Sequence, residues 1–281
     1  MATIDPVPTY ERADRPPVDL RTDVPHPARV YDYLLGGKDN FAADRAAAEK
    51  GLQANPSSRV PPRENRRFLV RAVRHLAAEA GIRQFLDIGT GIPTAPSVHE
   101  VAQAVDPTTR VVYADNDPIV LSHARALLTG TPEGQTAYLD ADLRDVDAIL
   151  DSPVLRATLD LGQPVGLLLI AILHFVGDDD DPYGIVRRLI DALPSGSYLA
   201  LSHLTGDFNP AAWEKIAAIY RAQGVTMRVR SRAEIDRFFT GLELIEPGVQ
   251  VVSRWRPDEA GEATPPTDAE VSVYGAVARK A

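Results

Sequence analysis

The stretch Phe85-Leu86-Asp87-Ile88-Gly89-Thr90-Gly91-Ile92-Pro93 decides the fold. A short apolar run carries one acid and then breaks into a loop with two glycines, and residues 98–105 follow with apolar side chains at helical spacing. This pattern predicts a strand, a tight turn and the start of a helix. Glycine permits a positive φ and lets a ligand approach the bare backbone, while the first N–H groups of the helix have no partner within it. The loop is therefore expected to hold a ligand.

Strand-like and helix-like segments alternate after this stretch. We expect strands over residues 84–88, 110–114, 136–139, 165–173, 197–202, 242–252 and 271–278, and helices over residues 98–105, 119–128, 146–150, 182–193, 210–223 and 232–239. Alternation of this kind predicts an α/β fold, a parallel sheet with helices on both faces. Only a polar loop, residues 256–267, separates the last two of these seven strands, so the final strand is expected to run antiparallel.

The segment before the first strand has a different character. Residues 1–25 are rich in proline and charge and are expected to form a flexible arm. Helices are expected over residues 27–35, from Asp39 or Asn40 to about residue 53, and from Pro61 to about residue 80. The predicted organisation is thus an arm (1–25), a helical N-terminal cap (26–82) and an α/β domain (83–281).

Composition limits the classes of function. The chain has 281 residues and a net charge of −9, which argues against nucleic acid as a partner. It has no cysteine, which excludes disulfides and thiolate chemistry. The N-terminus lacks the apolar core of a signal peptide, and the longest apolar run, residues 165–173, is about half of a membrane span. We expect a cytoplasmic protein without a membrane segment. No metal site is expected either, since the acidic run at residues 178–181 is interpreted as a solvated loop that caps the next helix.

Acids stand where several predicted strands end, the edge at which doubly wound sheets bind ligands. Asp115 lies 24 residues after Gly91 and can accept hydrogen bonds from both ribose hydroxyls of a nucleoside. Asp142 follows the next strand and can accept from the exocyclic amine of adenine. The loop lacks the third glycine of dinucleotide sites, and the carboxylate of Asp87 would repel a pyrophosphate while attracting a cationic amino-acid group. These polarities fit S-adenosylmethionine and disfavour a nicotinamide-dependent oxidoreductase.

The three motifs around Asp87, Asp115 and Asp142 resemble the successive cofactor motifs of class I S-adenosylmethionine-dependent methyltransferases. The segment His26-Pro-Ala-Arg-Val-Tyr-Asp-Tyr-Leu-Leu-Gly-Gly-Lys-Asp-Asn40, with Arg63-Glu-Asn-Arg66, resembles more narrowly an actinobacterial methyltransferase-like family first catalogued as a domain of unknown function. This similarity extends from about residue 26 to 280. The chain departs from the pattern at Ser97, where an Asn is expected, and at Val146, where Pro is common.

The resemblance implies a Rossmann-like domain that binds S-adenosyl-L-methionine beneath an N-terminal lid. Gly89 and Gly91 would approach the methionine part, Asp87 would order its ammonium group, and Arg63 and Asn65 are candidates for its carboxylate. The full set of implied cofactor-binding residues is Arg29, Tyr33, Gly36, Gly37, Arg63, Asn65, Asp87, Gly89, Thr90, Gly91, Asp115, Asn116, Asp142, Leu143, Ala171 and His174.

Other roles are open for several of these residues. Asp87 could pair with Arg83 as a structural ion pair, and Asp117 could cap the helix that follows Pro118. His174 is a candidate catalytic base, since an imidazole titrates near neutrality, and His203 or a tyrosine could also serve. Structural packing of His174 is equally consistent with the sequence, and an amine acceptor would require no base.

The expected activity is methyl transfer to an unidentified small-molecule acceptor. Because the resembled family is actinobacterial, the resemblance suggests a secondary metabolite as this acceptor. The alternative is a non-catalytic protein that binds S-adenosylmethionine or S-adenosylhomocysteine. A homodimer is compatible with either function.

Overall fold

The computed structural model describes residues 20–127, 130–258 and 264–281. Most of the expected arm (1–25), the end of the expected helix at residues 119–128 and part of the loop at residues 256–267 lie outside this description.

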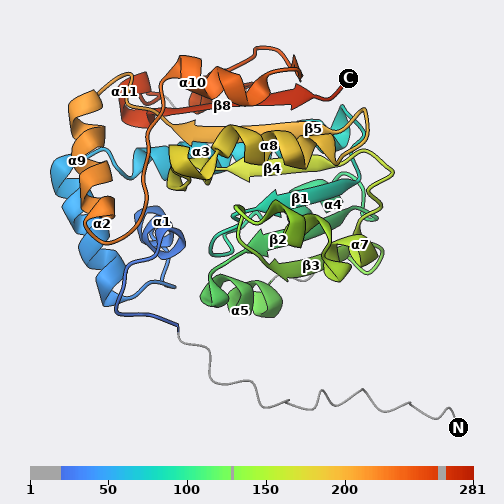
Figure 1. Ribbon diagram of the computed structural model, residues 1–281, viewed down its shortest axis with the longest axis horizontal. Helices are drawn as coiled ribbons and strands as arrows, with labels where there is room; N and C mark the ends of the chain where they lie inside the picture. The colour runs from blue at the N-terminus through green and yellow to red at the C-terminus, as the bar shows by residue number, and fades with distance from the viewer. Residues whose placement is uncertain (1–19, 128–129, 259–263) are drawn as a thin grey trace, which may run out of the picture.

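An eight-stranded sheet forms the centre of the molecule (Figure 1), with the order β3-β2-β1-β4-β5-β8-β6 and with β7 beside β8. Strands β1 to β5 run parallel, whereas β8 is antiparallel to β5, β6 and β7. The predicted α/β sheet with one antiparallel strand is therefore confirmed. The strands are β1 (Gln84–Ile88), β2 (Arg110–Asp115), β3 (Gln135–Asp140), β4 (Gly166–Ile170), β5 (Tyr198–Leu204), β6 (Glu243–Leu244), β7 (Gln250–Val251) and β8 (Val273–Arg279).

Helices cover both faces of the sheet, with α3 behind it and α8 in front of it in Figure 1. The α-helices are α1 (Pro27–Leu35), α2 (Ala42–Ala54), α3 (Val60–Ala78), α4 (Val98–Gln103), α5 (Pro118–Leu127), α6 (Val146–Leu150), α7 (Pro153–Thr158), α8 (Pro182–Asp191), α9 (Pro210–Arg221), α10 (Arg232–Asp236) and α11 (Asp268–Val271). Short 3-10 turns lie at η1 (Leu173–Phe175), η2 (Asp178–Asp180), η3 (Arg237–Phe239) and η4 (Val252–Arg254).

Several segments differ from the sequence-based expectation, among them two strands and a helix. The strand expected over residues 165–173 ends at Ile170, because Ala171 has a φ of 55° and the chain turns into η1. The strand expected over residues 242–252 is two strands of two residues, because Gly248 has a φ of 78° and its N–H donates to Ile245 O in a turn. Helix α7 was not expected, although Ser152 caps it and Pro153 begins it.

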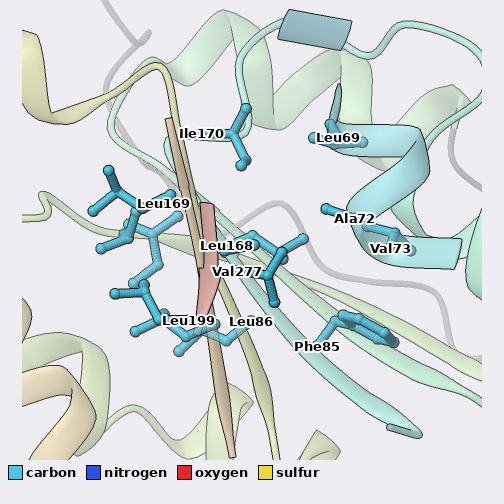
Figure 2. Packing of buried hydrophobic residues seen from close by; sticks show 14 of the residues in the cluster. Leu69, Ala72, Val73, Phe85, Leu86, Leu168, Leu169, Ile170, Leu199 and Val277 are labelled. Atoms are coloured by element: carbon cyan, nitrogen blue, oxygen red, sulfur yellow. The ribbon is translucent and has the colours of Figure 1, made fainter. Parts of the chain in front are cut away.

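The main core packs α3 against the sheet. Figure 2 shows Leu69, Ala72 and Val73 of α3 facing Leu168 and Val277 from two strands of the sheet. These side chains are almost fully buried, and each leucine or valine buried in this way stabilises the fold by roughly 1.5–3 kcal/mol. Helix α3 therefore belongs to the layer that supports the sheet, while the boundary proposed at residue 82 stays a prediction.

Helices α1 and α2 form a smaller cap at the end of the sheet where the parallel strands finish (Figure 1). Val30, Ala47 and Ala48 make a separate apolar cluster between them, and α2 contacts α9. Within the described residues, no helix has the length and apolar character required to cross a bilayer.

Candidate functional site

A cavity of about 420 Å³ lies at the carboxyl ends of β1, β2, β3 and β4, below α1. Ten of the predicted cofactor-binding residues line it, together with Arg66, which was not among them. The ten are Asn65, Asp87, Gly89, Thr90, Gly91, Asp115, Asn116, Asp142, Leu143 and Ala171. The structure therefore brings together side chains from four strand ends at one cavity.

The glycine loop after β1 forms the floor of this cavity. Gly89 and Gly91 have φ values of 76° and 68°, a region in which a side chain is strained. A Cβ on Gly89 would lie 2.6 Å from Ile172 Cγ1, so the loop has no room for a larger residue there. The N–H of Gly91 donates to Asp115 Oδ2 at 2.9 Å, which joins the loop to the end of β2.

Asp87 is a buried acid at the wall of the cavity. Burial raises the pKa of its carboxyl to about 6, although Thr90 Oγ1 donates to it at 2.8 Å and Arg66 attracts its charge. Arg83, the alternative partner, pairs instead with Asp106 at 2.7 Å, so the structural ion pair considered from the sequence does not form. A carboxylate held in this way would be stabilised by a cationic group in the cavity.

Two further acids follow β2 and β3. Asp115 is buried, and burial raises its pKa, although the N–H groups of Asp117 and Gly91 donate to it at 2.9 Å each. Asp142 is more exposed, and its hydrogen bonds with Arg144 lower its pKa to about 2. Asn116 Nδ2 donates to Asp142 Oδ2 at 3.2 Å, which brings the ends of the two strands into contact.

The arginine of α3 that reaches the cavity is Arg66, one helical turn after the predicted Arg63, and Arg21 and Arg144 line the cavity as well. Its guanidinium donates to Thr94 O and Pro96 O at 2.7 Å each and so holds the segment that follows the glycine loop. Arg63 is exposed and does not line the cavity. Both arginines belong to the quoted Arg63-Glu-Asn-Arg66 motif, and the rotation of α3 decides which of them faces inward.

Four predicted residues of the N-terminal segment also lie outside the cavity lining. Arg29 is buried between Asp44 and Asp117, at 3.4 and 3.9 Å. Tyr33 makes a hydrogen bond with Glu49. Gly36 and Gly37 terminate α1, and a Cβ on Gly37 would collide with Asp32. The ion pairs of Arg29, the hydrogen bond of Tyr33 and the turn at Gly36 and Gly37 explain these residues without a ligand.

His26, which the sequence reasoning did not single out as a site residue, joins the start of α1 to the cavity. His26 lines it, and its Nδ1 lies 3.0 Å from Asp117 Oδ2 at the start of α5. Asp117 also accepts from Ile119 N at 2.8 Å, as expected for a helix cap. The hydrogen bond and charge of His26 hold the pKa of Asp117 below its usual range against the opposing effect of burial, which is the largest single influence. Tyr31 from α1 lines the cavity as well.

His174 borders a second, smaller cavity rather than the larger one. The guanidinium of Arg230 donates to Leu173 O at 3.0 Å and to Val176 O at 3.1 Å, which clamps the turn that carries His174. Burial is the main reason why the pKa of His174 lies well below its usual value, so the imidazole is neutral near pH 7.

The acidic run at residues 178–181 is structural. Asp178 pairs with Arg228 and Arg230, at 3.0 and 2.7 Å, and Asp181 caps α8 by accepting from Gly184 N. In residues 20–127, 130–258 and 264–281, no three acids or histidines converge in a way that could hold a metal ion.

A model of the S-adenosyl methyltransferase family matches residues 13–281 of the chain. A DUF574 family protein from Streptomyces avermitilis is 54% identical, with a TM-score of 0.91, over 94% of this chain and 100% of that one. A candidate methyltransferase from Thermobifida fusca is 44% identical, with a TM-score of 0.83, over 95% of this chain and 99% of that one.

More distant structures share the fold alone. The plantazolicin methyltransferase BamL, solved with S-adenosylhomocysteine, is 11% identical with a TM-score of 0.52, over 90% of this chain and 95% of that one. A comparison with curated proteins finds no match. The relatives confirm the predicted class I S-adenosylmethionine-dependent methyltransferase fold.

Proposed function

The chain belongs to the S-adenosyl methyltransferase family, and from this premise we propose that it is an active enzyme that methylates a small-molecule acceptor. Its cofactor is S-adenosyl-L-methionine, which supplies an electrophilic methyl group on a positively charged sulfur. The rest of the work falls to the protein, which has to bind the cofactor, orient the acceptor and exclude water.

The observation that carries the proposal is the order of charged and polar groups around the larger cavity. At one wall, the buried carboxylate of Asp87 would attract the ammonium of the methionine part, and the loop of Gly89 and Gly91 would let it approach the backbone. Asp115 at the end of β2 would accept the ribose hydroxyls. Asn116, Asp142 and Leu143 would surround the adenine. The residues present thus match an amino acid at one end and an adenosine at the other.

We assign two further roles from the cavity lining. Asn65 and Arg66 are consecutive residues of α3, and Arg66 would supply the positive charge that the carboxylate of the methionine part requires. Ala171 lines both cavities and would lie beside the sulfonium, where its left-handed backbone turns the chain out of β4. Residues Arg29, Tyr33, Gly36, Gly37 and Arg63 are left out of the proposed site, because none of them lines the cavity.

Calorimetric titration tests the binding half of this proposal. S-adenosylmethionine and S-adenosylhomocysteine should bind, whereas NAD should give no signal. Asp115→Asn should weaken both ligands by more than about 1 kcal/mol, the scale of a lost hydrogen bond. The matched control is Asp147→Asn, because Asp147 is an exposed acid that pairs with Arg188 and does not line the cavity.

Transfer of a labelled methyl group tests the catalytic half. The protein should move label from S-adenosylmethionine into small molecules of a cell extract and release S-adenosylhomocysteine. Tight binding without any transfer would support the non-catalytic alternative, and tight binding of NAD with no signal from S-adenosylmethionine would refute the proposal.

A further inference from the structure

A second cavity of about 70 Å³ lies between the cap, the end of β5 and α9. It adjoins the larger cavity, because five residues line both of them: Pro27, Tyr31, Asn65, Ala171 and Phe175. The segments that enclose it come from distant parts of the chain, with α2 lying beside α9 (Figure 1). A molecule in the second cavity would therefore sit next to Ala171, the residue proposed to lie beside the sulfonium.

The lining of the second cavity carries no formal charge. Its twenty residues include no Asp, Glu, Lys or Arg, and most of them are aliphatic or aromatic. A carboxylate, phosphate or ammonium group placed there would lose its hydration without gaining a partner, at a cost of several kcal/mol. The charged groups of the site lie instead around the larger cavity. The larger cavity therefore suits the polar groups of a ligand, and the second cavity suits an apolar group.

Two buried polar atoms of this lining have no hydrogen-bond partner. They are His174 Nδ1 and Trp213 Nε1, and the exposed fraction of each residue is 3%. Buried polar atoms are normally paired, so an unpaired donor and an unpaired imidazole nitrogen at one apolar cavity indicate a ligand with a polar group. Trp213 can only donate a hydrogen bond. Burial lowers the pKa of His174 and keeps its imidazole neutral, so its Nδ1 can accept a hydrogen bond when the proton of the ring is on Nε2.

A chain of hydrogen bonds forms the boundary between the two cavities. Ala171 N donates to Ser202 Oγ at 3.0 Å, and Ser202 Oγ donates to Asn65 Oδ1 at 2.5 Å. Asn65 Nδ2 then donates to Tyr31 Oη, which donates to Pro62 O, both at 3.0 Å. Each of these side chains is hydrogen-bonded within the protein, so the chain holds Asn65 and Tyr31 in place beside Ala171, while His174 Nδ1 and Trp213 Nε1 have no protein partner.

The volume of the second cavity limits the size of its occupant. About 70 Å³ has room for roughly five to seven water-sized groups, at about 10–15 Å³ for each. One phenol molecule has seven non-hydrogen atoms. The four aromatic side chains of the lining, Tyr31, Phe175, Trp213 and Tyr220, also suit the faces and edges of a flat ring.

We propose that the second cavity binds the methyl acceptor, and that this acceptor is a compact, uncharged molecule of phenol type whose hydroxyl faces Ala171. The inference rests on the methyl-transfer function proposed above. In the reaction, the acceptor oxygen forms a bond to the methyl carbon while the bond from that carbon to sulfur breaks, and the electron pair of that bond remains on the sulfur. The hydroxyl proton passes to His174 Nδ1 and then to water. Trp213 Nε1–H donates to the acceptor oxygen.

Binding of three probes to the protein saturated with S-adenosylhomocysteine tests the proposal. Phenol should bind, toluene should bind about five- to tenfold more weakly because it lacks the hydroxyl, and benzoate should show no binding. Saturation-transfer NMR measures all three affinities. Equal binding of benzoate and phenol, or no binding of phenol, would overturn the proposal.

Gly51 on α2 offers a position at which a side chain can be added to the lining of the second cavity. It lines the cavity, and a Cβ on it would meet no atom within 4 Å. Gly51→Leu should weaken phenol by about tenfold or more, because a close-packed side chain excludes the ring. Ala46→Leu adds the same side chain to the exposed side of α2 and should leave phenol binding unchanged. An unchanged phenol affinity in Gly51→Leu would place the probe elsewhere and refute the assignment.

His174→Phe tests the polar contact separately from the fit. Replacing the imidazole by a ring of similar shape should reduce the preference for phenol over toluene, because only the hydrogen bond from Trp213 remains, and an unchanged preference would show that His174 is only structural. With labelled S-adenosylmethionine, the wild-type protein should convert phenol into labelled anisole, and bound phenol that yields no anisole would contradict the assignment.

Titration of S-adenosylmethionine on the same samples separates the two proposals. If S-adenosylmethionine fails to bind, the proposed function fails. If it binds with equal affinity to the wild type and to Gly51→Leu while phenol does not bind to either, only the assignment of the second cavity fails.

Discussion

Asp87 should make binding of S-adenosylmethionine depend on pH between 5 and 7. Burial raises the pKa of its carboxyl from an ordinary 3.8 to about 6 in the absence of a ligand. The ammonium of the methionine part attracts only the ionised carboxylate. An α-amino group titrates at about 7.7–8.0, so the ligand keeps its positive charge over this range. The charge that changes between pH 5 and 7 is therefore that of the protein.

The size of the effect follows from the fraction of ionised Asp87. At pH 7 about nine-tenths of the carboxyl groups are ionised, and at pH 5 about one-tenth are, if the pKa is about 6. The affinity should therefore fall about tenfold from pH 7 to pH 5, which corresponds to about 1.4 kcal/mol. Asp87→Asn should weaken binding at pH 7 and lose most of this dependence, with a remainder from Asp115, whose pKa burial also raises.

The same shift predicts an effect on stability with the opposite sign. Because the pKa of Asp87 is higher in the folded protein than in the unfolded chain, its contribution to stability is greatest below about pH 4 and is lost as the pH rises through about 6. The gap between 3.8 and about 6 corresponds to ~3 kcal/mol above pH 6. Asp87→Asn should therefore raise the unfolding free energy of the ligand-free protein at pH 8, by up to that amount, and by less at pH 5.

Calorimetric titration at pH 5, 6 and 7 and denaturant unfolding at pH 5 and 8 provide the measurements, with Asp147→Asn as the exposed control. The reasoning would be refuted if Asp87→Asn kept the full pH dependence of the wild type. A lower free energy of unfolding for Asp87→Asn than for the wild type at pH 8 would equally contradict the reasoning, because it would show that the buried carboxylate stabilises the fold.

Two further substitutions test other parts of the larger cavity. Arg66→Gln should weaken the binding of S-adenosylmethionine by about 1.5–3 kcal/mol, the scale of a charged hydrogen bond. The control is Arg63→Gln on the exposed side of α3, which should bind like the wild type. Equal losses of affinity in calorimetric titration would show that Arg66 has no special role. Gly89→Ala should lower the unfolding free energy by about 1–3 kcal/mol, because its φ is 76° and the new Cβ would collide with Ile172, and an unchanged denaturation midpoint would show that the loop relaxes.

Local sequence signals predicted the central strands and the first helix closely. The ranges expected for β1 (84–88) and for α1 (27–35) agree with the structure to the residue, and the helix expected to start at residue 146 starts there as α6. Each of these elements has a signal within a few residues, namely an apolar run followed by glycine, a proline near the helix start, or an aspartate cap. Residues on the loops after β1, β2 and β3 could also be placed at one cavity, because parallel strands share a carboxyl edge.

Features that depend on tertiary packing could not be predicted in this way. Arg63 and Arg66 stand one turn apart on α3, and only the packing of the opposite side of that helix on the sheet decides which of them faces the cavity. The assignment of His174 to the larger cavity followed from its position after β4, whereas Ala171 turns the chain there and carries His174 to the neighbouring cavity.

The second cavity had no counterpart in the sequence analysis. Its walls come from α1, α2, α3, α9 and the loop after β4, and more than 150 residues separate Ala47 from Trp213. Apolar residues at helical spacing indicate that one face of a helix is buried, but they do not show which other element packs against that face. Small residues such as Ala47, Ala48 and Gly51 therefore appear as ordinary helix positions until α9 is placed opposite them.

A crystal structure of the complex with S-adenosylhomocysteine tests the central claim most directly. The account predicts the ligand in the larger cavity, with its ribose hydroxyls on Asp115, its ammonium on the side of Asp87, its adenine beside Asp142 and Leu143, and its sulfur facing Ala171. A ligand bound elsewhere, or in this cavity with the adenosine at Asp87 and the amino acid at Asp142, would contradict the account.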